Sequence, residues 1–492
     1  MTIRVFTWKD VRLPLQLLIG LTLLAMTVCV CCYAYRLGSP LLRGDDWYYT
    51  NTIVKSYLEG HLGIMDFFYK RGPDENAQPI NRLVLLALVK WFQMDFTLQG
   101  LLGALLAAAC VVLLTFLAWR EPRPAGQPEW ARALLPFGLG AVILSLNAYG
   151  DYGWPLVTAL VYTGTLGISL YLYFAAGLSE RGAWFRLGLL TFAVLVLLDT
   201  FATLAVLGGV LLLLARMPSS PHRWRAAAAA LAAFLGLFIY QHLFTWLTGT
   251  ANSPLGVDAL LNSGSYLLHH LDSAWKLLIA PFGAALLEPR PQQLHPWEIM
   301  AVPAVLVWPL HIWFWWRFVR ERHNRVAFVA GGLMLYTYGT VVGMMVSRIP
   351  EHDFDYLLQP RYVAFYQLQL VAMLLMWSRM GASRLRPRDY GVWAAGACTL
   401  LLGLNVYSAL LAWKVQPYVD KYNQRVAAQM QALAKDPAHP PQGCLPDITP
   451  CKWPEAPRRQ VIQILQSHQL NAFSAGMRAR HAYLWPDPAV RP

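Results

Sequence analysis

Residues 15–35 read LQLLIGLTLLAMTVCVCCYAY, a run without a charged residue that is long enough to cross a lipid bilayer as a helix. Further long apolar runs occupy 98–119, 187–215, 226–247 and 326–346. The chain of 492 residues is 57% hydrophobic and only 14% charged, and a soluble fold could not bury so much apolar surface. The sequence therefore predicts an all-α polytopic membrane protein.

Hydropathy and charge together predict how the chain crosses the membrane. Segment 80–95 is apolar but short and contains Arg82 and Lys90, so we expect a helix that lies on the outer surface. About eleven transmembrane helices then remain. The expected spans are 14–35, 97–119, 133–148, 155–177, 183–197, 198–215, 225–247, 299–316, 326–347, 360–378 and 391–413.

This arrangement places the basic loops and the N-terminus on the cytoplasmic side, because Lys and Arg are enriched in cytoplasmic loops. The same bias accounts for the net charge of +13 without a nucleic-acid partner. An odd number of spans puts the C-terminus outside. We expect a transmembrane module at 1–413 with large outer loops at 36–96 and 248–298, followed by an outer C-terminal segment at 414–492.

The C-terminal segment has its own features. Helical patterns cover 421–435 and 459–470. Cys444 and Cys451 lie between them, and in an oxidising compartment they can close a disulfide. The other five cysteines fall within apolar spans and are expected to be small buried hydrophobic residues.

Two adjacent acids follow the first span, in the run Arg43-Gly44-Asp45-Asp46-Trp47-Tyr48. Neighbouring carboxylates repel each other, so their presence suggests that they bind a cation, hold a hydroxyl group or accept a proton. The alternative is that one of them caps a helix over 47–59. Trp47 and Tyr48 belong to the interfacial aromatic belt or supply a flat surface for a sugar or lipid.

Other outer segments carry further candidates. Asp151 stands in a short turn rich in Gly and aromatic residues, which is either an ordinary polar turn or a second acid of the site. Arg361 opens an apolar span on the outer side, where an arginine is costly unless it snorkels or meets an anion such as phosphate. The remaining candidates for substrate contacts are Arg82, Arg348, His352, Lys70 and Arg71.

These residues occur in a recognisable order. One span precedes the acidic pair, Gln78-Pro79-Ile80-Asn81-Arg82 opens the surface helix before the second span, and Asp151 follows as a second outer acid. In this the chain resembles the glycosyltransferase C (GT-C) superfamily of integral membrane enzymes, and especially bacterial members that modify O-antigen, pilin or lipid A. The motifs cover roughly 36–160, and the rest of the resemblance lies in the architecture.

The resemblance implies a fold of GT-C type and a glycosyltransferase of a bacterial inner membrane with its site on the periplasmic side. The donor would be a polyprenyl-phosphate sugar and the acceptor a hydroxyl of a cell-envelope glycan or protein. Asp45 or Asp46 would act as general base or ligate Mg²⁺ or Mn²⁺, Asp151 would assist, and arginines would stabilise the leaving phosphate. The alternatives are a transporter or flippase of lipid-linked sugars and a glycan polymerase or ligase.

Overall fold

The computed structural model describes residues 8–69, 79–125, 127, 129–220, 222–248, 257–287, 296–380 and 387–485. These residues form helices and connecting segments, and no β-strand occurs among them. Eight described helical segments are long and apolar enough to span a membrane. They lie in α1 (Trp8–Leu37), α5 (Phe96–Arg120), α6 (Glu129–Ile143) with α7 (Tyr149–Gly153), α8 (Pro155–Arg181), α11 (Arg223–Thr248), α14 (Pro296–Glu321), α15 (Arg325–Ser347) and α18 (Pro387–Trp413). The prediction of an all-α, multi-pass membrane protein is confirmed.

Each of the eleven expected spans coincides with a helix. The three positions outside the set of eight hold shorter apolar helices: α9 (Trp184–Leu198), α10 (Thr200–Arg216) and α17 (Val363–Trp377). A helix of 15 residues is only about 22 Å long, less than the thickness of the hydrocarbon core. The number of crossings therefore stays a prediction.

Local sequence signals explain where several long helices begin and end. Asp95 precedes α5 and accepts a hydrogen bond from the Thr97 backbone N–H, 3.2 Å away, which satisfies a donor of the first turn. Asn324 caps α15 in the same way, with bonds to two backbone N–H groups. Gly182 ends α8 in a left-handed conformation, φ 70°, as a residue without a Cβ does readily.

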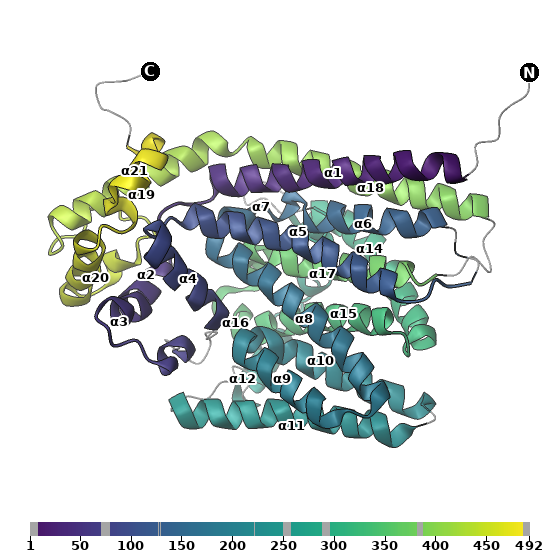
Figure 1. Cartoon of the computed structure of the whole chain (residues 1–492). Coiled ribbons are helices and arrows are strands. Elements are labelled where there is room, and N and C mark those ends of the chain that lie inside the picture. The colour runs from purple at the N-terminus through teal and green to yellow at the C-terminus, as the bar shows by residue number, and fades with distance from the viewer. Residues whose placement is uncertain are drawn as a thin grey trace, which may run out of the picture.

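Figure 1 shows the long helices side by side, with the short helices α2–α4 and α19–α21 gathered at one end, which we call the loop end. The first loop forms α2 (Asp46–Tyr49), a π-helical segment (Thr50–Val54), α3 (Lys55–Leu58), a 3₁₀ turn (Ile64–Phe68) and α4 (Pro79–Phe92). Other connections form α12 (Val257–His269), α13 (Lys276–Gly283) and α16 (Ile349–His352). The tail forms α19 (Gln416–Lys435), α20 (Glu455–Ser467) and α21 (Ala475–Arg480).

The helices expected within the loops and the tail are present. Residues 46–58 are continuously helical where 47–59 was expected, and α4 occupies the segment expected at 80–95. In the tail, α19 and α20 match the patterns at 421–435 and 459–470 with somewhat different ends. Because each has one apolar face, each has to pack against another element.

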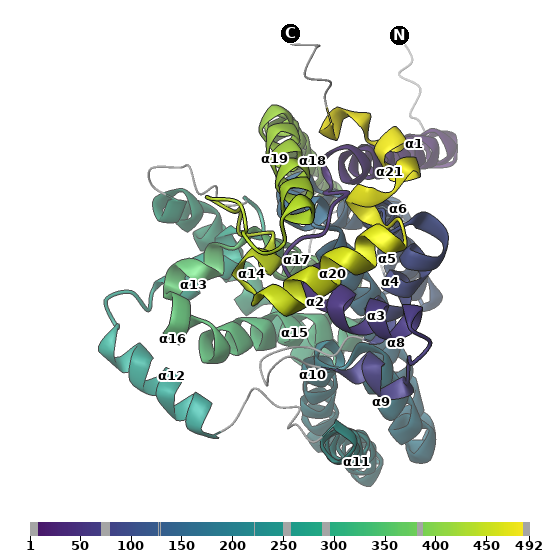
Figure 2. The same cartoon turned by 90° about the vertical axis from the view of Figure 1, so that its left-hand side faces the viewer.

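The first loop and the tail share one hydrophobic core, separate from the core of the bundle. Trp47, Leu88 and Phe96 from the first loop and the start of α5 pack in the same cluster as Met430 and Leu465 from the tail. In Figure 2, which faces the loop end, α20 crosses in front of α2 and α3. The tail thus completes the structure of the first loop, although nearly the whole chain separates them.

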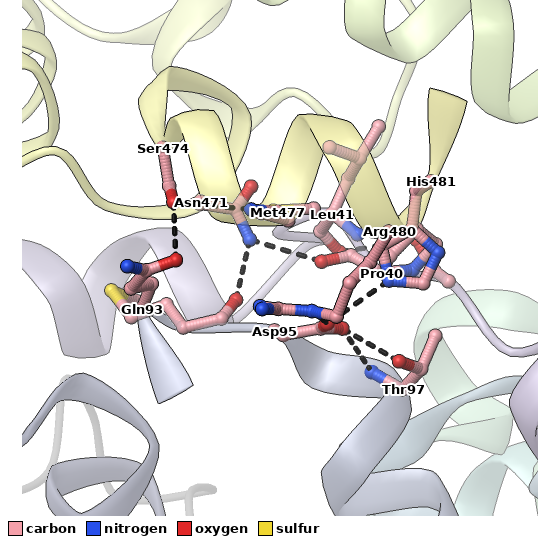
Figure 3. Close-up of polar contacts among 12 residues, drawn as sticks. Pro40, Leu41, Gln93, Asp95, Thr97, Asn471, Ser474, Met477, Arg480 and His481 are labelled. Carbon is pink, nitrogen blue, oxygen red and sulfur yellow. Dashed lines mark hydrogen bonds and ion pairs between the residues drawn. The ribbon is translucent and has the colours of Figure 1, made fainter. Parts of the chain in front are cut away.

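A buried polar network anchors the end of the tail to the first turn of α5 (Figure 3). Asp95 accepts hydrogen bonds from Arg480 Nε and His481 Nε2, each 3.0 Å away, and from the Thr97 hydroxyl at 2.6 Å. Asn471 donates to the backbone oxygens of Pro40 and Met94. Burial alone would raise the pKa of Asp95, but these hydrogen bonds outweigh it and hold the pKa below the usual value.

Candidate functional site

The two acids of the Asp-Asp pair have different surroundings. Asp46 is 3% exposed, and its Oδ2 accepts a hydrogen bond from the Arg43 backbone N–H at 3.0 Å, so it closes the turn that starts α2. Burial raises the pKa of Asp46 to about 8, against the effect of that hydrogen bond, and the neighbouring charge of Asp45 adds to the rise. Burial therefore favours the protonated form of Asp46, and its carboxyl group holds the turn before α2.

Asp45 is partly exposed and occupies the cap position of α2. Its side chain makes no capping hydrogen bond to that helix, so within the described chain capping does not account for this acid. The charge of Asp45 acts on Arg361, which shows that the two groups lie near each other. Of the pair, Asp45 is the more accessible acid and the one whose charge acts on Arg361.

Arg43, two residues before the pair, is held by residues of the tail. Its Nη2 donates to Asn423 Oδ1 at 2.6 Å, its Nε lies 3.5 Å from Asp447 Oδ2, and its guanidinium lies 5.5 Å from the centre of the Tyr422 ring. Burial lowers the pKa of Arg43, and Asp447 is the strongest charge opposing that shift. Residues of the tail thus compensate part of the cost of burying the Arg43 charge.

Arg361 lies among aromatic rings just before α17. Its guanidinium lies 5.9 Å from the ring centre of Trp154, 5.4 Å from that of Tyr356 and 5.3 Å from that of Tyr362, and it donates a short hydrogen bond to the Tyr356 hydroxyl. Aromatic faces attract a cation and offset part of its desolvation. Arg361 Nε is buried and has no hydrogen-bond partner within the described ranges.

Asp151 fixes the turn of α7 against the start of α17. It is fully buried, and its Oδ2 accepts a hydrogen bond from the Ala364 backbone N–H at 3.1 Å. A carboxylate at this position satisfies a donor of the first turn and interacts favourably with the helix dipole. The preceding Gly150 packs against Pro360, where an added Cβ would lie 2.2 Å from the proline Cβ. Asp151 therefore positions the segment that carries Arg361.

A cavity of about 450 Å³ lies where these segments meet. Its polar wall includes Arg43, Arg361 and Asp447, and its aromatic wall includes Tyr149, Trp154, Tyr418 and Tyr422. Tyr33 and Leu37 from the end of α1 and Val415 and Val419 from the start of α19 add apolar surface. Asp45 is not among the residues that line this cavity, but its neighbour Gly44 lies near Trp154, and its charge acts on Arg361, and both of these residues line it.

Four segments that the sequence placed on the outer side thus meet at one end of the bundle: 43–46, 149–154, 359–361 and the tail. Asp45 and Asp151 each lie near enough to Arg361 for their charges to act on it, although neither lines the cavity, and their roles stay predictions. Which side of a membrane this end faces stays a prediction.

The two aromatic candidates belong to the junction of the first loop and the tail and do not line the cavity. Trp47 is fully buried and donates from Nε1 to the Asp447 backbone oxygen at 3.0 Å. The Tyr48 ring packs against Trp453, with 4.9 Å between the ring centres. Tyr149, Trp154, Tyr418 and Tyr422 take the place that was expected for Trp47 and Tyr48.

The remaining cationic candidates are more scattered. Arg82 is 3% exposed and donates to the backbone oxygens of Asp66 and Tyr69, so it holds the first loop against α4 and does not line the cavity. His352 stacks on Tyr356 with 5.0 Å between ring centres. Arg348 lies close enough to Tyr362 for the two groups to interact electrostatically. Lys70 and Arg71 lie outside the described residues.

The described residues hold no large cluster of metal-ligating side chains. No group of three or more His, Cys, Asp or Glu side chains capable of holding a metal occurs among them. Asp46 is committed to a backbone hydrogen bond, whereas Mg²⁺ and Mn²⁺ are bound by accessible oxygen ligands. Dependence on Mg²⁺ or Mn²⁺ stays a prediction.

The sequence did not identify Arg43 or Asp447 as members of the site. Arg43 directly precedes the motif Gly44-Asp45-Asp46, and Asp447 lies between the two tail cysteines. The structure joins those cysteines in a disulfide, with 6.4 Å between the Cα atoms. A carboxylate in a loop closed by a disulfide was the signal that could have pointed to Asp447.

No protein-family model and no curated protein matches the chain. Among solved structures it is similar to ArnT from Cupriavidus metallidurans, whose crystal structure contains undecaprenyl phosphate. The two sequences are 14% identical, and the match covers 94% of this chain and 78% of ArnT with a TM-score of 0.43. A similarity at this level does not establish a common fold or a common activity.

Proposed function

We propose that the protein is a membrane glycosyltransferase that moves a sugar from a polyprenyl-phosphate donor to a hydroxyl group of a cell-envelope glycan or protein. The observation that carries this proposal is the cavity at the loop end, which combines two arginines, aromatic rings and an apolar wall. The charge of Asp45 acts on Arg361, one of these two arginines. A substrate that fits it has an anionic head and an apolar chain.

The apolar wall of the cavity suits the lipid part of such a donor. Tyr33 and Leu37 lie at the end of the first membrane-spanning helix, and Val415 and Val419 follow directly after the last. Both pairs therefore lie close to the membrane boundary. A polyprenyl chain could leave the cavity between α1 and α19 and continue into the hydrocarbon region without exposing its apolar surface to water.

The cationic wall suits the phosphate. Arg361 has a buried Nε without a hydrogen-bond partner in the described part of the chain, and Arg43 is fixed by Asn423 and Asp447. Guanidinium groups donate paired hydrogen bonds to phosphate oxygens. Because the phosphate gains charge as it leaves the sugar, such contacts strengthen in the transition state and lower the barrier.

Asp45 is the proposed general base. It takes the proton from the acceptor hydroxyl, whose oxygen attacks the anomeric carbon of the sugar. The bond between that carbon and the phosphate oxygen breaks, and the polyprenyl phosphate leaves with its charge stabilised by Arg361 and Arg43. Asp46 is less suited to this role, because it is buried and its Oδ2 already accepts the hydrogen bond from the Arg43 backbone N–H.

The proposal is tested by binding of undecaprenyl phosphate to the purified protein in detergent. Arg361→Gln should weaken binding by about 2 kcal/mol, roughly thirtyfold, which is typical of a lost charged hydrogen bond. The matched control is Arg459→Gln, an exposed arginine of α20 that pairs with Glu455, and its affinity should equal that of the wild type. Absence of binding by the wild type, or equal binding by Arg361→Gln, would contradict the proposal.

A transfer assay separates catalysis from transport. The proposed enzyme forms a new glycosidic bond and releases polyprenyl phosphate. A flippase would instead move a lipid-linked sugar between the leaflets of a vesicle without releasing the sugar. Translocation without transfer would replace the proposed activity by the transport alternative.

A further inference from the structure

The loop closed by Cys444 and Cys451 is bonded to the backbone of the Asp-Asp motif. The Asp447 backbone oxygen accepts hydrogen bonds from the Gly44 N–H at 3.0 Å and from Trp47 Nε1 at 3.0 Å. The Thr449 hydroxyl donates to the Gly44 backbone oxygen at 2.8 Å. Three hydrogen bonds thus join the tail loop to residues 44–47, on both sides of Asp45 and Asp46.

The Asp447 side chain faces the cavity from this loop. Its Oδ2 accepts a hydrogen bond from the Tyr422 hydroxyl at 3.0 Å and lies 3.5 Å from Arg43 Nε. Asp447 and Arg43 both line the cavity, and Asp447 is the one carboxylate among the described lining residues. Asn423, one residue after Tyr422, accepts from Arg43 Nη2 at 2.6 Å. Arg43 is therefore held from two directions by the tail.

We infer that Asp447 is a positioning residue that holds Arg43 in place for the donor phosphate, and that the disulfide between Cys444 and Cys451 is required to present it. This inference rests on the proposed function, because it assigns the phosphate contact of the same cavity. The position of Arg43 in the anion-binding half of the cavity then depends on the C-terminal tail and on its oxidation.

The geometry indicates that Asp447 orients Arg43, and that it does not act only through its charge on the phosphate site. An aspartate lowers the local positive potential, so its removal would tighten phosphate binding if only net charge mattered. If Asp447 instead fixes the orientation of Arg43, its removal lets the guanidinium adopt other rotamers, and binding has to order it again. The two models predict opposite signs for the effect of Asp447→Asn.

The redox arm of the test measures the affinity for undecaprenyl phosphate with and without dithiothreitol. Dithiothreitol converts the disulfide to two thiols and is itself oxidised to a cyclic disulfide. We expect about tenfold weaker binding by the reduced wild type, the scale of one strong coupling between contacting residues. The variant Cys444→Ser/Cys451→Ser should bind weakly in both conditions. It keeps the other five cysteines, so a redox response that persists in it would overturn the inference.

The second arm leaves the disulfide intact. Asp447→Asn should also weaken binding about tenfold, and Asp447→Glu should recover part of the loss because it restores an anion near Arg43. The double variant Arg43→Gln/Asp447→Asn should bind no more weakly than Arg43→Gln alone, since Asp447 acts through Arg43. The control Asp436→Asn removes an exposed tail carboxylate that bonds to His439 and should bind like the wild type.

The outcomes distinguish the inference from the function on which it rests. Tighter binding by Asp447→Asn, or additive losses in the double variant, would overturn the inference while the proposed function stands. If the oxidised wild type binds no lipid phosphate, the proposed function fails. In that case the unfolding temperatures of the same single and double variants test whether Asp447 positions Arg43. Additive shifts would contradict a coupling of the two residues.

Discussion

Asp45 and Asp46 are adjacent in the chain, but one is partly exposed and the other is buried in a turn. A helical backbone points consecutive side chains in directions about 100° apart, so one of two neighbours can face the core while the other faces solvent. The burial of Asp46 stabilises its neutral form, whereas Asp45 lies near the positive charge of Arg361. Their chemistry therefore differs although their side chains are identical.

Replacement of each acid by asparagine should separate the two roles. We expect Asp45→Asn to lower the rate of sugar transfer at least a hundredfold, because general base catalysis contributes about that factor or more. Asp46→Asn should keep most of the activity, since an amide oxygen can still accept the hydrogen bond from the Arg43 N–H. Transfer assays on both variants at equal expression measure this, and equal losses would contradict the assignment.

The same variants differ in how stability depends on pH. Burial raises the pKa of Asp46 in the folded state to about 8. The neutral Asp46 therefore contributes fully to the stability of the fold below the unfolded pKa of about 4, and this contribution is lost as the pH rises to about 8. Asp46→Asn should remove this decline, because asparagine does not titrate. Unfolding temperatures in detergent between pH 5 and 9 measure the difference, and an unchanged slope in Asp46→Asn would argue against the buried neutral acid.

The two arginines that the sequence suggested as phosphate contacts differ in their hydrogen-bond partners. Arg361 was selected from the sequence because it opens an apolar helix, and it lines the cavity. Arg82 has a similar sequence context, but backbone carbonyls of the first loop take up its donors. A sequence shows that a buried arginine needs acceptors, but not whether the protein or a ligand supplies them.

At the scale of elements, the contact between α7 and the start of α17 positions Arg361. Gly150 allows the two segments to approach, and Asp151 bonds to the first turn of α17. The sequence identified this turn by its acid and its aromatic residues. It did not indicate the partner segment, which lies about 210 residues further along the chain.

Gly150→Ala should therefore displace the segment that carries Arg361. Its Cβ would lie 2.2 Å from the Cβ of Pro360, and forced overpacking of this kind typically costs about 1–3 kcal/mol. Gly153→Ala is the matched control, because nothing lies within 4 Å of its added Cβ. We expect a lower unfolding temperature for Gly150→Ala than for Gly153→Ala. Equal stability of the two variants would show that the turn tolerates the side chain.

Helix positions followed well from local patterns. The segments at 46–58, α4, α19 and α20 all lie where apolar periodicity placed helices. Their ends differ by several residues in places because capping and tertiary contacts decide where a helix stops. The π-helical segment Thr50–Val54 was not predicted, and α20 packs against it.

At the scale of the molecule, the tail is joined to the first loop by a shared apolar core and by the network around Asp95 (Figure 3). The Asp95 side chain is 1% exposed and that of His481 3%, while that of Arg480 is 41% exposed. The half-exposed Arg480 contributes less because water screens its charge. The buried part of the network therefore carries most of the anchoring.

Asp95→Asn should loosen the tail. Removal of one partner from a buried charge network typically costs about 3 kcal/mol, because the other partner stays buried without its counter-charge. We expect a lower unfolding temperature and faster trypsin cleavage within the tail. The control Glu455→Gln breaks the exposed pair with Arg459 and should change stability by less than about 1 kcal/mol.

Acid should have a related effect. The pKa of Asp95 is lowered in the folded state, so its stabilising contribution is present above the unfolded pKa of about 4 and is lost as the pH falls through the folded value. Protection of the tail from an acid-active protease such as pepsin should therefore decrease below about pH 4 in the wild type. The same decrease in Asp95→Asn would show that another group is responsible.

Composition and local pattern alone determined that this is a helical membrane protein, where its helices lie and which short segments carry acids and cations. These properties follow from the transfer of apolar residues out of water and from helical periodicity, both of which act over a few turns of chain. They do not depend on which helices are neighbours.

Only the tertiary structure decided which of these groups share a cavity. In the folded chain Asp45 lies near Arg361, and Arg82 bonds to the backbone of the first loop. Asp447 contacts Arg43, although the two residues lie near opposite ends of the chain. The physical reason is that burial and charge compensation at a site depend on the packing of segments distant in sequence, and one chain taken alone does not reveal that packing.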